Sequence, residues 1–185
     1  RQPYMLRRYL TPTRVSGSAE QAAALSILSE VLGGSGVTSR LGRALQVDQA
    51  IALSAGSFYS ASAMDPNSFG IWAVPAEGVA LPDLEQAVDQ VIARLAAEGP
   101  TEDELARARA AVRAGEIYAQ DSGAGLARSY GAALAVGLTV QHVRDWPDHL
   151  AAVTAEDVRA AAALLDIDAS VTGYLTRDET EGSQG

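Results

Sequence analysis

The first residues of the chain carry a strand pattern followed by a helix pattern. Residues Tyr4 to Leu10 are rich in strand formers and end at Thr11-Pro12-Thr13, which predicts a first strand. The capping-box pattern Ser18-x-x-Gln21 comes next. It precedes apolar residues at steps of three and four, namely Ala22, Leu25, Leu28, Val31 and Leu32. This spacing predicts a helix with one apolar face.

A glycine-rich run, Gly33-Gly34-Ser35-Gly36, follows that helix. We expect its first two glycines to end the helix near Val31, because glycine adopts the positive φ of a helix C′ position without a Cβ clash. Thr38 or Ser39 can then cap a short second helix over residues 39–47. The small and aromatic residues from Ile51 to Ser60 predict a strand.

The rest of the chain predicts a hairpin, a block of helices and a returning strand. A turn at 65–67 joins the preceding strand to an antiparallel strand over 69–74. Helices are predicted from Leu81-Pro82 to Gly99-Pro100, from Thr101-x-x-Glu104, within 121–137, from Thr139 and from Thr154, with a last strand over 169–175. Pro147 is expected to kink or divide the helix that contains it. This order predicts an α+β fold, a mostly antiparallel sheet with helices packed on one face.

Composition limits the class of protein. With 185 residues, 48% of them hydrophobic, the chain can build the core of one domain, assigned to residues 1–177. Residues 178–185 are expected to be an acidic disordered tail. A net charge of -9 disfavours nucleic acid and anionic membranes, and no apolar run approaches the roughly 20 residues of a membrane span. The absence of cysteine excludes disulfides and thiolate metal sites. Because the chain starts at Arg1 without Met, we expect it to be a piece of a longer polypeptide.

The residues alone show no catalytic or metal site. His142 and His149 would lie about 10.5 Å apart along a helix, which is wider than the i, i+4 spacing of zinc-binding histidines. The glycine run lacks the phosphate-loop pattern, and no G-x-S-x-G nucleophile elbow occurs. In the helix after Thr101, the three arginines are expected to face outward as a solvated surface, namely Arg107, Arg109 and Arg113.

Six short segments stand out along the chain. They are Leu28-Ser29-Glu30-Val31-Leu32-Gly33-Gly34, Thr38-Ser39-Arg40-Leu41, Pro100-Thr101-Glu102-Asp103-Glu104-Leu105, Tyr118-Ala119-Gln120-Asp121-Ser122, Ala133-Leu134-Ala135-Val136-Gly137 and Val153-Thr154-Ala155-Glu156-Asp157-Val158. In this order they resemble the second, non-zinc-binding domain of the pitrilysin or insulinase family of zinc metallopeptidases. The chain is similar to the bacterial zinc-protease type, related to the mitochondrial processing peptidase. The resemblance implies the processing-peptidase-like fold.

The resemblance also implies a division of labour. In that family an H-x-x-E-H domain or partner subunit binds zinc and activates water, and this sequence lacks that motif. The chain is then expected to enclose and position a peptide substrate opposite that domain, with Gly33, Gly34, Ser35 and Gly36 facing the substrate and the zinc held by the partner. A catalytically dead scaffold or assembly domain of the same fold is the alternative, and a small-molecule-binding domain is a third possibility. The periplasm is the expected compartment, with the cytoplasm as the alternative.

Two positions depart from the family. Its second domain contributes an Arg and a Tyr that stabilise the tetrahedral intermediate, and these align with Gln46 and Leu53. The amide of Gln46 can still donate a hydrogen bond, whereas Leu53 cannot. Tyr59, which a period of two places on the face of Leu53, and Arg43 on the short helix are the candidate substitutes. The alternative for Tyr59 is packing beside Phe58 and Trp72.

Overall fold

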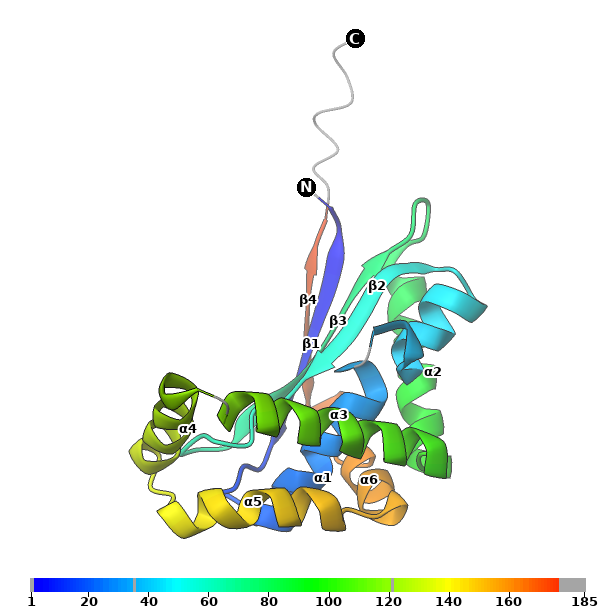
Figure 1. Cartoon of the computed structure of the whole chain (residues 1–185). Coiled ribbons are helices and arrows are strands. Elements are labelled where there is room, and N and C mark those ends of the chain that lie inside the picture. The colour runs from blue at the N-terminus through cyan, green and yellow to red at the C-terminus, as the bar shows by residue number, and fades with distance from the viewer. Residues whose placement is uncertain (1, 35, 121, 177–185) are drawn as a thin grey trace.

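The computed structural model describes residues 2–34, 36–120 and 122–176. Its centre is a four-stranded sheet in the order β2-β3-β1-β4, in which every neighbouring pair is antiparallel (Figure 1). The strands are β1 (Tyr4–Thr11), β2 (Ala52–Phe58), β3 (Asn67–Pro75) and β4 (Ser170–Leu175). The predicted α+β class and the β2–β3 hairpin are confirmed.

Helices make up most of the remaining described chain. They are α1 (Ala19–Ser29), α2 (Leu81–Glu98), α3 (Glu102–Gln120), α4 (Gly123–Ala135), α5 (Val140–Ala152) and α6 (Ala155–Ala162). Short turns of other helix types are η1 (Glu30–Gly34), η2 (Gly36–Thr38), η3 (Gly42–Asp48) and η4 (Ile167–Ala169). The predicted capping boxes at Ser18, Thr101 and Thr154 are all formed.

Burial alternates along β1, so one face of the sheet is the core face. Met5 and Tyr9 of β1 and Phe69 and Ile71 of β3 are fully or almost fully buried there. Leu10, on the opposite face of β1, is 73% exposed. This difference confirms the prediction that the helices pack on one face of the sheet.

Helix α1 lies at the centre of the helical layer. The predicted apolar face from Ala22 to Leu32 is buried, but so are Ala23, Ala24 and Ile27. The reason is that α1 contacts α3, α5 and α6, while its continuation η1 packs on β2 (Figure 1). A helix with neighbours on several sides buries apolar residues all round rather than along one stripe.

A buried arginine fixes α2 to the sheet. Arg7 of β1 is 1% exposed and pairs with Glu85 and Asp89 of α2, and its Nε donates to Thr172 Oγ1 of β4 at 2.8 Å. Burial alone would lower the pKa of Arg7, but the hydrogen bonds to Tyr9 and Asp89 outweigh it and raise that pKa. The guanidinium therefore stays charged inside the fold, with its charge compensated.

Two segments differ from the predicted pattern, the end of the first helix and the region around Pro147. The helix does not end near Val31, because η1 carries it on to Gly34. Pro147 does not divide α5, which runs unbroken from Val140 to Ala152. The tail over 178–185 lies outside the described residues.

Candidate functional site

The end of the first helix lies directly on the edge strand β2. Neither Gly33 nor Gly34 has positive φ; among the described residues of this run only Gly36 does, at 59°. A Cβ on Gly33 would lie 2.2 Å from the backbone nitrogen of Ser57, so glycine is required here for close approach and not for its φ. The expectation of a positive-φ cap at Gly33 or Gly34 is wrong, because the helix continues and β2 occupies the space beside it.

The glycine run therefore offers less surface than expected. Gly33 is buried and cannot face a substrate, whereas Gly34 and Gly36 are exposed. Ser35 lies outside the described residues. We retain only the exposed glycines as candidate substrate contacts.

Ser39 and Arg40 hold the segment that follows. The Ser39 hydroxyl accepts a hydrogen bond from the Gly42 nitrogen at 3.1 Å, which confirms Ser39 as a cap. Arg40 donates to both carboxylate oxygens of Glu104, at 2.6 and 2.9 Å, and to the Gly99 carbonyl at 3.0 Å. This bidentate pair ties the η2–η3 segment to the first turn of α3.

The Glu104 carboxylate binds two partners, the guanidinium of Arg40 and the first-turn residue Thr101. Burial alone would raise the pKa of Glu104, but the hydrogen bond and charge of Arg40, together with hydrogen bonds from Thr101, outweigh it and lower that pKa. The carboxylate thus stays ionised and serves two partners. The sequence pattern points to the local capping box with Thr101, but it has no signal for Arg40, which is 64 residues away.

The positions that align with the family Arg and Tyr lie on η3 and at the start of β2, which pack against each other. Gln46 is half-buried, and within the described part of the chain its amide has no hydrogen-bond partner. Arg43 is exposed on the same turn of chain. Leu53 is 58% exposed at an irregularity of β2, where the register with β3 shifts between Ala52 and Ser54. This surface therefore presents the unpaired amide of Gln46, the positive charge of Arg43 and the apolar side chain of Leu53.

Tyr59 lies just beyond the end of β2 and is already engaged. Its hydroxyl donates to the Pro12 carbonyl at 2.6 Å, and its ring stacks on Phe69 with centroids 6.2 Å apart. Burial raises the pKa of Tyr59. The period of two that relates it to Leu53 does not hold, because the bulge interrupts the alternation. Its aromatic neighbour is Phe69 rather than Phe58 and Trp72.

Both histidines have structural contacts. His142 Nδ1 accepts a hydrogen bond from the Thr139 nitrogen at 3.2 Å in the capping box of α5. His149 Nδ1 lies 3.5 Å from Glu20 of α1. Among the described residues, no group of three or more His, Cys, Asp or Glu side chains is arranged to hold a metal ion. In the same part of the chain, every helix is too short or too polar to cross a membrane.

A comparison with protein families identifies this arrangement. The model of the peptidase M16 inactive domain matches residues 2–112, which include the sheet strands β1 to β3 and the whole candidate site. The chain belongs to this family. No curated protein sequence matches it significantly.

Solved structures show how far the M16 fold extends along the chain. The inactive peptidase domain from Bordetella parapertussis superposes with a TM-score of 0.84 at 20% identity, over 95% of this chain and 93% of that one. A protease from Helicobacter pylori gives 0.83 at 21% identity, over 95% of this chain and 41% of that protease. The periplasmic protease PqqL from Escherichia coli gives 0.72 at 18% identity, over 95% of this chain and 19% of that protease. The M16 inactive-domain fold thus spans nearly the whole chain, but only part of the longer proteases.

Proposed function

We propose that this M16 inactive domain is the non-catalytic half of a zinc metallopeptidase. It encloses a peptide substrate and positions it opposite an H-x-x-E-H domain, which holds the zinc and activates water. The observation that carries the proposal is the inactive-domain fold over almost the full chain, combined with a coverage of only 41% of the Helicobacter pylori protease. The rest of such a protease has room for a catalytic domain.

The surface formed by η3 and the start of β2 is the part we assign to the substrate. Gln46 has a side-chain amide without a partner in the described chain, and Arg43 is exposed beside it. Donors held by a rigid fold near a developing oxyanion lower the barrier without reorganisation. Tyr59 is the weaker candidate, because its hydroxyl must leave the Pro12 carbonyl before it can reach a substrate.

A catalytically dead scaffold of the same fold is the second candidate. The observation that favours it is Leu53, which is exposed at the position of the family Tyr and has no hydrogen-bonding group. A scaffold needs the fold and its surfaces but no donors toward a reacting carbonyl.

Reconstitution separates the two. The H-x-x-E-H half of the full protein is purified alone and with this chain, and cleavage of an unfolded peptide is followed in both samples. We expect this chain to raise kcat/KM, because orientation of remote parts of a substrate lowers the barrier. Equal cleavage in the two samples would exclude the enclosing role. Detection of stoichiometric, chelator-removable zinc in this chain alone would contradict the assignment of zinc to the partner.

We also propose the periplasm as the compartment. The likeness to the periplasmic protease PqqL supports this assignment. Fractionation of cells that express the full-length precursor tests it, and recovery of the protein with cytoplasmic markers would favour the alternative.

A further inference from the structure

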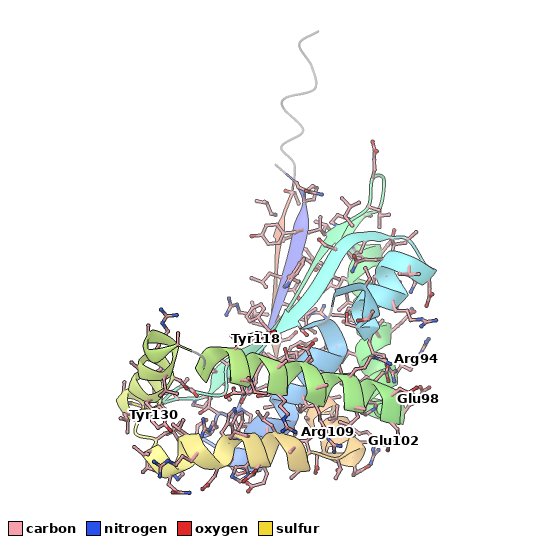
Figure 2. All side chains as sticks on the ribbon, viewed as in Figure 1. Arg94, Glu98, Glu102, Arg109, Tyr118 and Tyr130 are labelled. Carbon is pink, nitrogen blue, oxygen red and sulfur yellow. The ribbon has the colours of Figure 1, made fainter. Side chains whose placement is uncertain are left out.

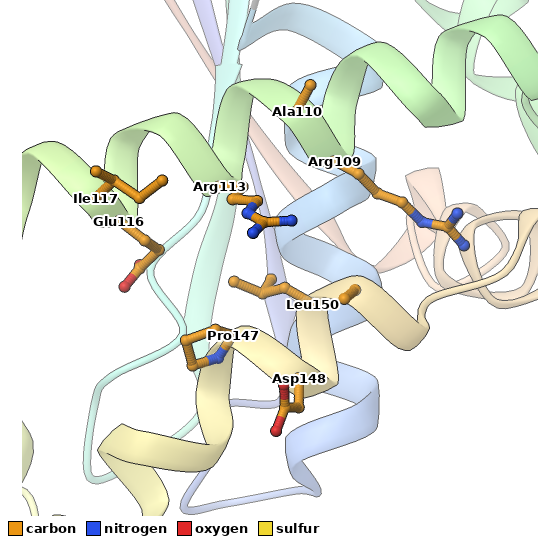
Figure 3. A pocket seen from close by; sticks show the side chains of 9 residues that line it. Arg109, Ala110, Arg113, Glu116, Ile117, Pro147, Asp148 and Leu150 are labelled. Atoms are coloured by element: carbon orange, nitrogen blue, oxygen red, sulfur yellow. The ribbon is translucent and has the colours of Figure 1, made fainter.

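A cleft between α3 and α5 plays no part in the proposed peptidase role. Its volume is about 560 Å³, within the usual range of small-molecule sites (Figure 3). Ile117 of α3 and Pro147 and Leu150 of α5 supply apolar walls. The family resemblance assigns no functional role to these side chains, and the sequence alone does not predict a pocket here.

Two arginines of α3 line this cleft, and Arg113 is the one whose donors are accessible from it. Arg109 is half-buried between α3 and α5 and does not face outward as the sequence suggests (Figure 2). It donates to the Val153 carbonyl, but its buried Nε has no hydrogen-bond partner within the described residues. Arg113, one turn on, extends into the space between the helices in Figure 3 and has no ion-pair partner in the described chain.

Two acidic side chains, Glu116 and Asp148, also line the cleft. Burial raises the pKa of Glu116, while the charge of the nearby Arg14 acts in the opposite sense. The Arg14 guanidinium lies 4.3 Å from the ring centre of Trp146. Asp148 points away from α3 in Figure 3. With Arg14 counted, three guanidinium groups lie in or beside the cleft against two carboxylates, although the chain as a whole has a net charge of -9.

The walls favour an aliphatic body over a peptide. Main-chain groups of a helix are paired within it, and Pro147 frees only the carbonyl four residues before it. An extended peptide would leave its own amides unpaired against such walls, which costs free energy. An alkyl chain has no polar groups to satisfy. A single anionic head on an alkyl chain matches both the charge and the walls.

We propose that the cleft between α3 and α5 binds an aliphatic monocarboxylate, with its carboxylate at the guanidinium of Arg113 and its alkyl chain along Ile117, Pro147 and Leu150. Arginine is the residue best suited to a carboxylate, because its donors match the two oxygens. The site is independent of the peptidase role, and this chain can be tested without a partner domain.

Calorimetry and amide chemical shifts with decanoate test the proposal on the whole chain. We expect saturable binding with a Kd below about 1 mM, and shifts that cluster on α3 and α5. Decanol and the variant Arg113→Gln should each weaken binding about fivefold or more, because each removes the charge-assisted hydrogen bonds. Ile117→Asp should weaken it similarly, since Ile117 is 54% exposed and its replacement spares the core.

Arg107→Gln is the matched control, because Arg107 is an exposed arginine on the same helix that does not line the cleft. It should leave the decanoate Kd unchanged. Unchanged binding by Arg113→Gln, equal weakening by Arg107→Gln, or shifts spread over the sheet would overturn the proposal. Tighter binding of a leucine-rich tripeptide with a free carboxyl end would overturn the choice of an alkyl chain.

Discussion

The absence of a side chain at Gly33 lets the end of the first helix touch the backbone of β2. Gly33→Ala should lower the free energy of unfolding by about 2 kcal/mol, because its Cβ would meet the Ser57 nitrogen and the tightly packed β2 backbone must move. Denaturant melts of the variant and the wild type measure this change.

Gly34→Ala and Gly36→Ala are informative companions. A Cβ on Gly34 would meet only the flexible end of Glu30, so a small effect is expected. Gly36 has φ of 59° and open space around it, so Gly36→Ala should cost about 1 kcal/mol from backbone strain alone. A Gly33→Ala variant as stable as Gly34→Ala would refute the close-approach role.

Ala50 is the one non-glycine residue with positive φ in the described chain, at 52°. It lies between the end of η3 at Asp48 and the start of β2 at Ala52, and its side chain makes the left-handed conformation unfavourable. Ala50→Gly should therefore raise the free energy of unfolding by about 0.5 kcal/mol or more, despite the extra freedom of glycine in the unfolded chain. Thermal and denaturant melts measure the shift.

The control is Ala93→Gly, at an exposed position in the interior of α2. There glycine should lower stability by about 1 kcal/mol, because the backbone is ordinary helix. If both variants lose the same free energy of unfolding, the left-handed conformation of Ala50 does not reduce the stability of the fold.

Among the elements, the Arg40–Glu104 pair joins the η2–η3 segment to α3 and makes stability depend on pH. The pKa of Glu104 is lowered in the folded state, so its contribution is present above the unfolded pKa and is lost as pH falls through the folded pKa. We expect the free energy of unfolding to drop as pH falls from about 5 to 3. Glu104→Gln should flatten part of that drop.

Glu102→Gln is the matched control in the same first turn, since Glu102 is exposed and has no ion pair in the described chain. Its profile should follow that of the wild type. Glu85, paired with Arg7, also has a lowered pKa and adds to the acid loss, so Glu104→Gln removes only a share. Identical pH slopes for Glu104→Gln and the wild type would contradict the linkage.

Elements set by nearby residues could be predicted from the sequence, and contacts across the fold could not. Capping boxes at Ser18 and Thr154 depend on residues three positions apart, and the structure has both. The continuation of the helix to Gly34 depends on β2, and the position of Arg109 depends on Val153, 44 residues later. Local sequence patterns contain no information on such distant partners. The end of the first helix at Gly34 and the inward position of Arg109 therefore could not be predicted from the sequence.

The candidate site, too, could be predicted from the sequence only where it depends on nearby residues. The family resemblance puts Gln46 on the predicted short helix and Leu53 on the strand that follows, and the structure has η3 and β2 in contact. The step from Leu53 to Tyr59 failed because it assumed a regular strand, and the bulge between Ala52 and Ser54 breaks that regularity. Whether Gln46 or Arg43 meets a substrate depends on a domain outside this chain and stays a prediction.

At the scale of the whole molecule, the peptidase and scaffold hypotheses differ in how they respond to restored donors. In the full protein, Gln46→Ala should lower kcat about tenfold if its amide supports the tetrahedral intermediate. The double variant Gln46→Arg, Leu53→Tyr restores the family pair and should raise kcat, since Leu53 is exposed and a larger polar side chain there disturbs no core. Val47→Ala, at the exposed neighbour of Gln46, is the control and should leave kcat unchanged.

The kcat values of the three variants distinguish the two hypotheses only if the stability of each variant is measured as well. Gln46 and Leu53 are not in the buried core, so melts should stay close to those of the wild type, and a change in kcat then reports on chemistry. A scaffold predicts unchanged, near-zero cleavage in all of them, whereas an active peptidase half predicts loss with Gln46→Ala and gain with the restored pair. A peptidase whose rate ignores both changes would still use this domain to enclose its substrate, but it would stabilise the intermediate with residues of the zinc-binding half alone.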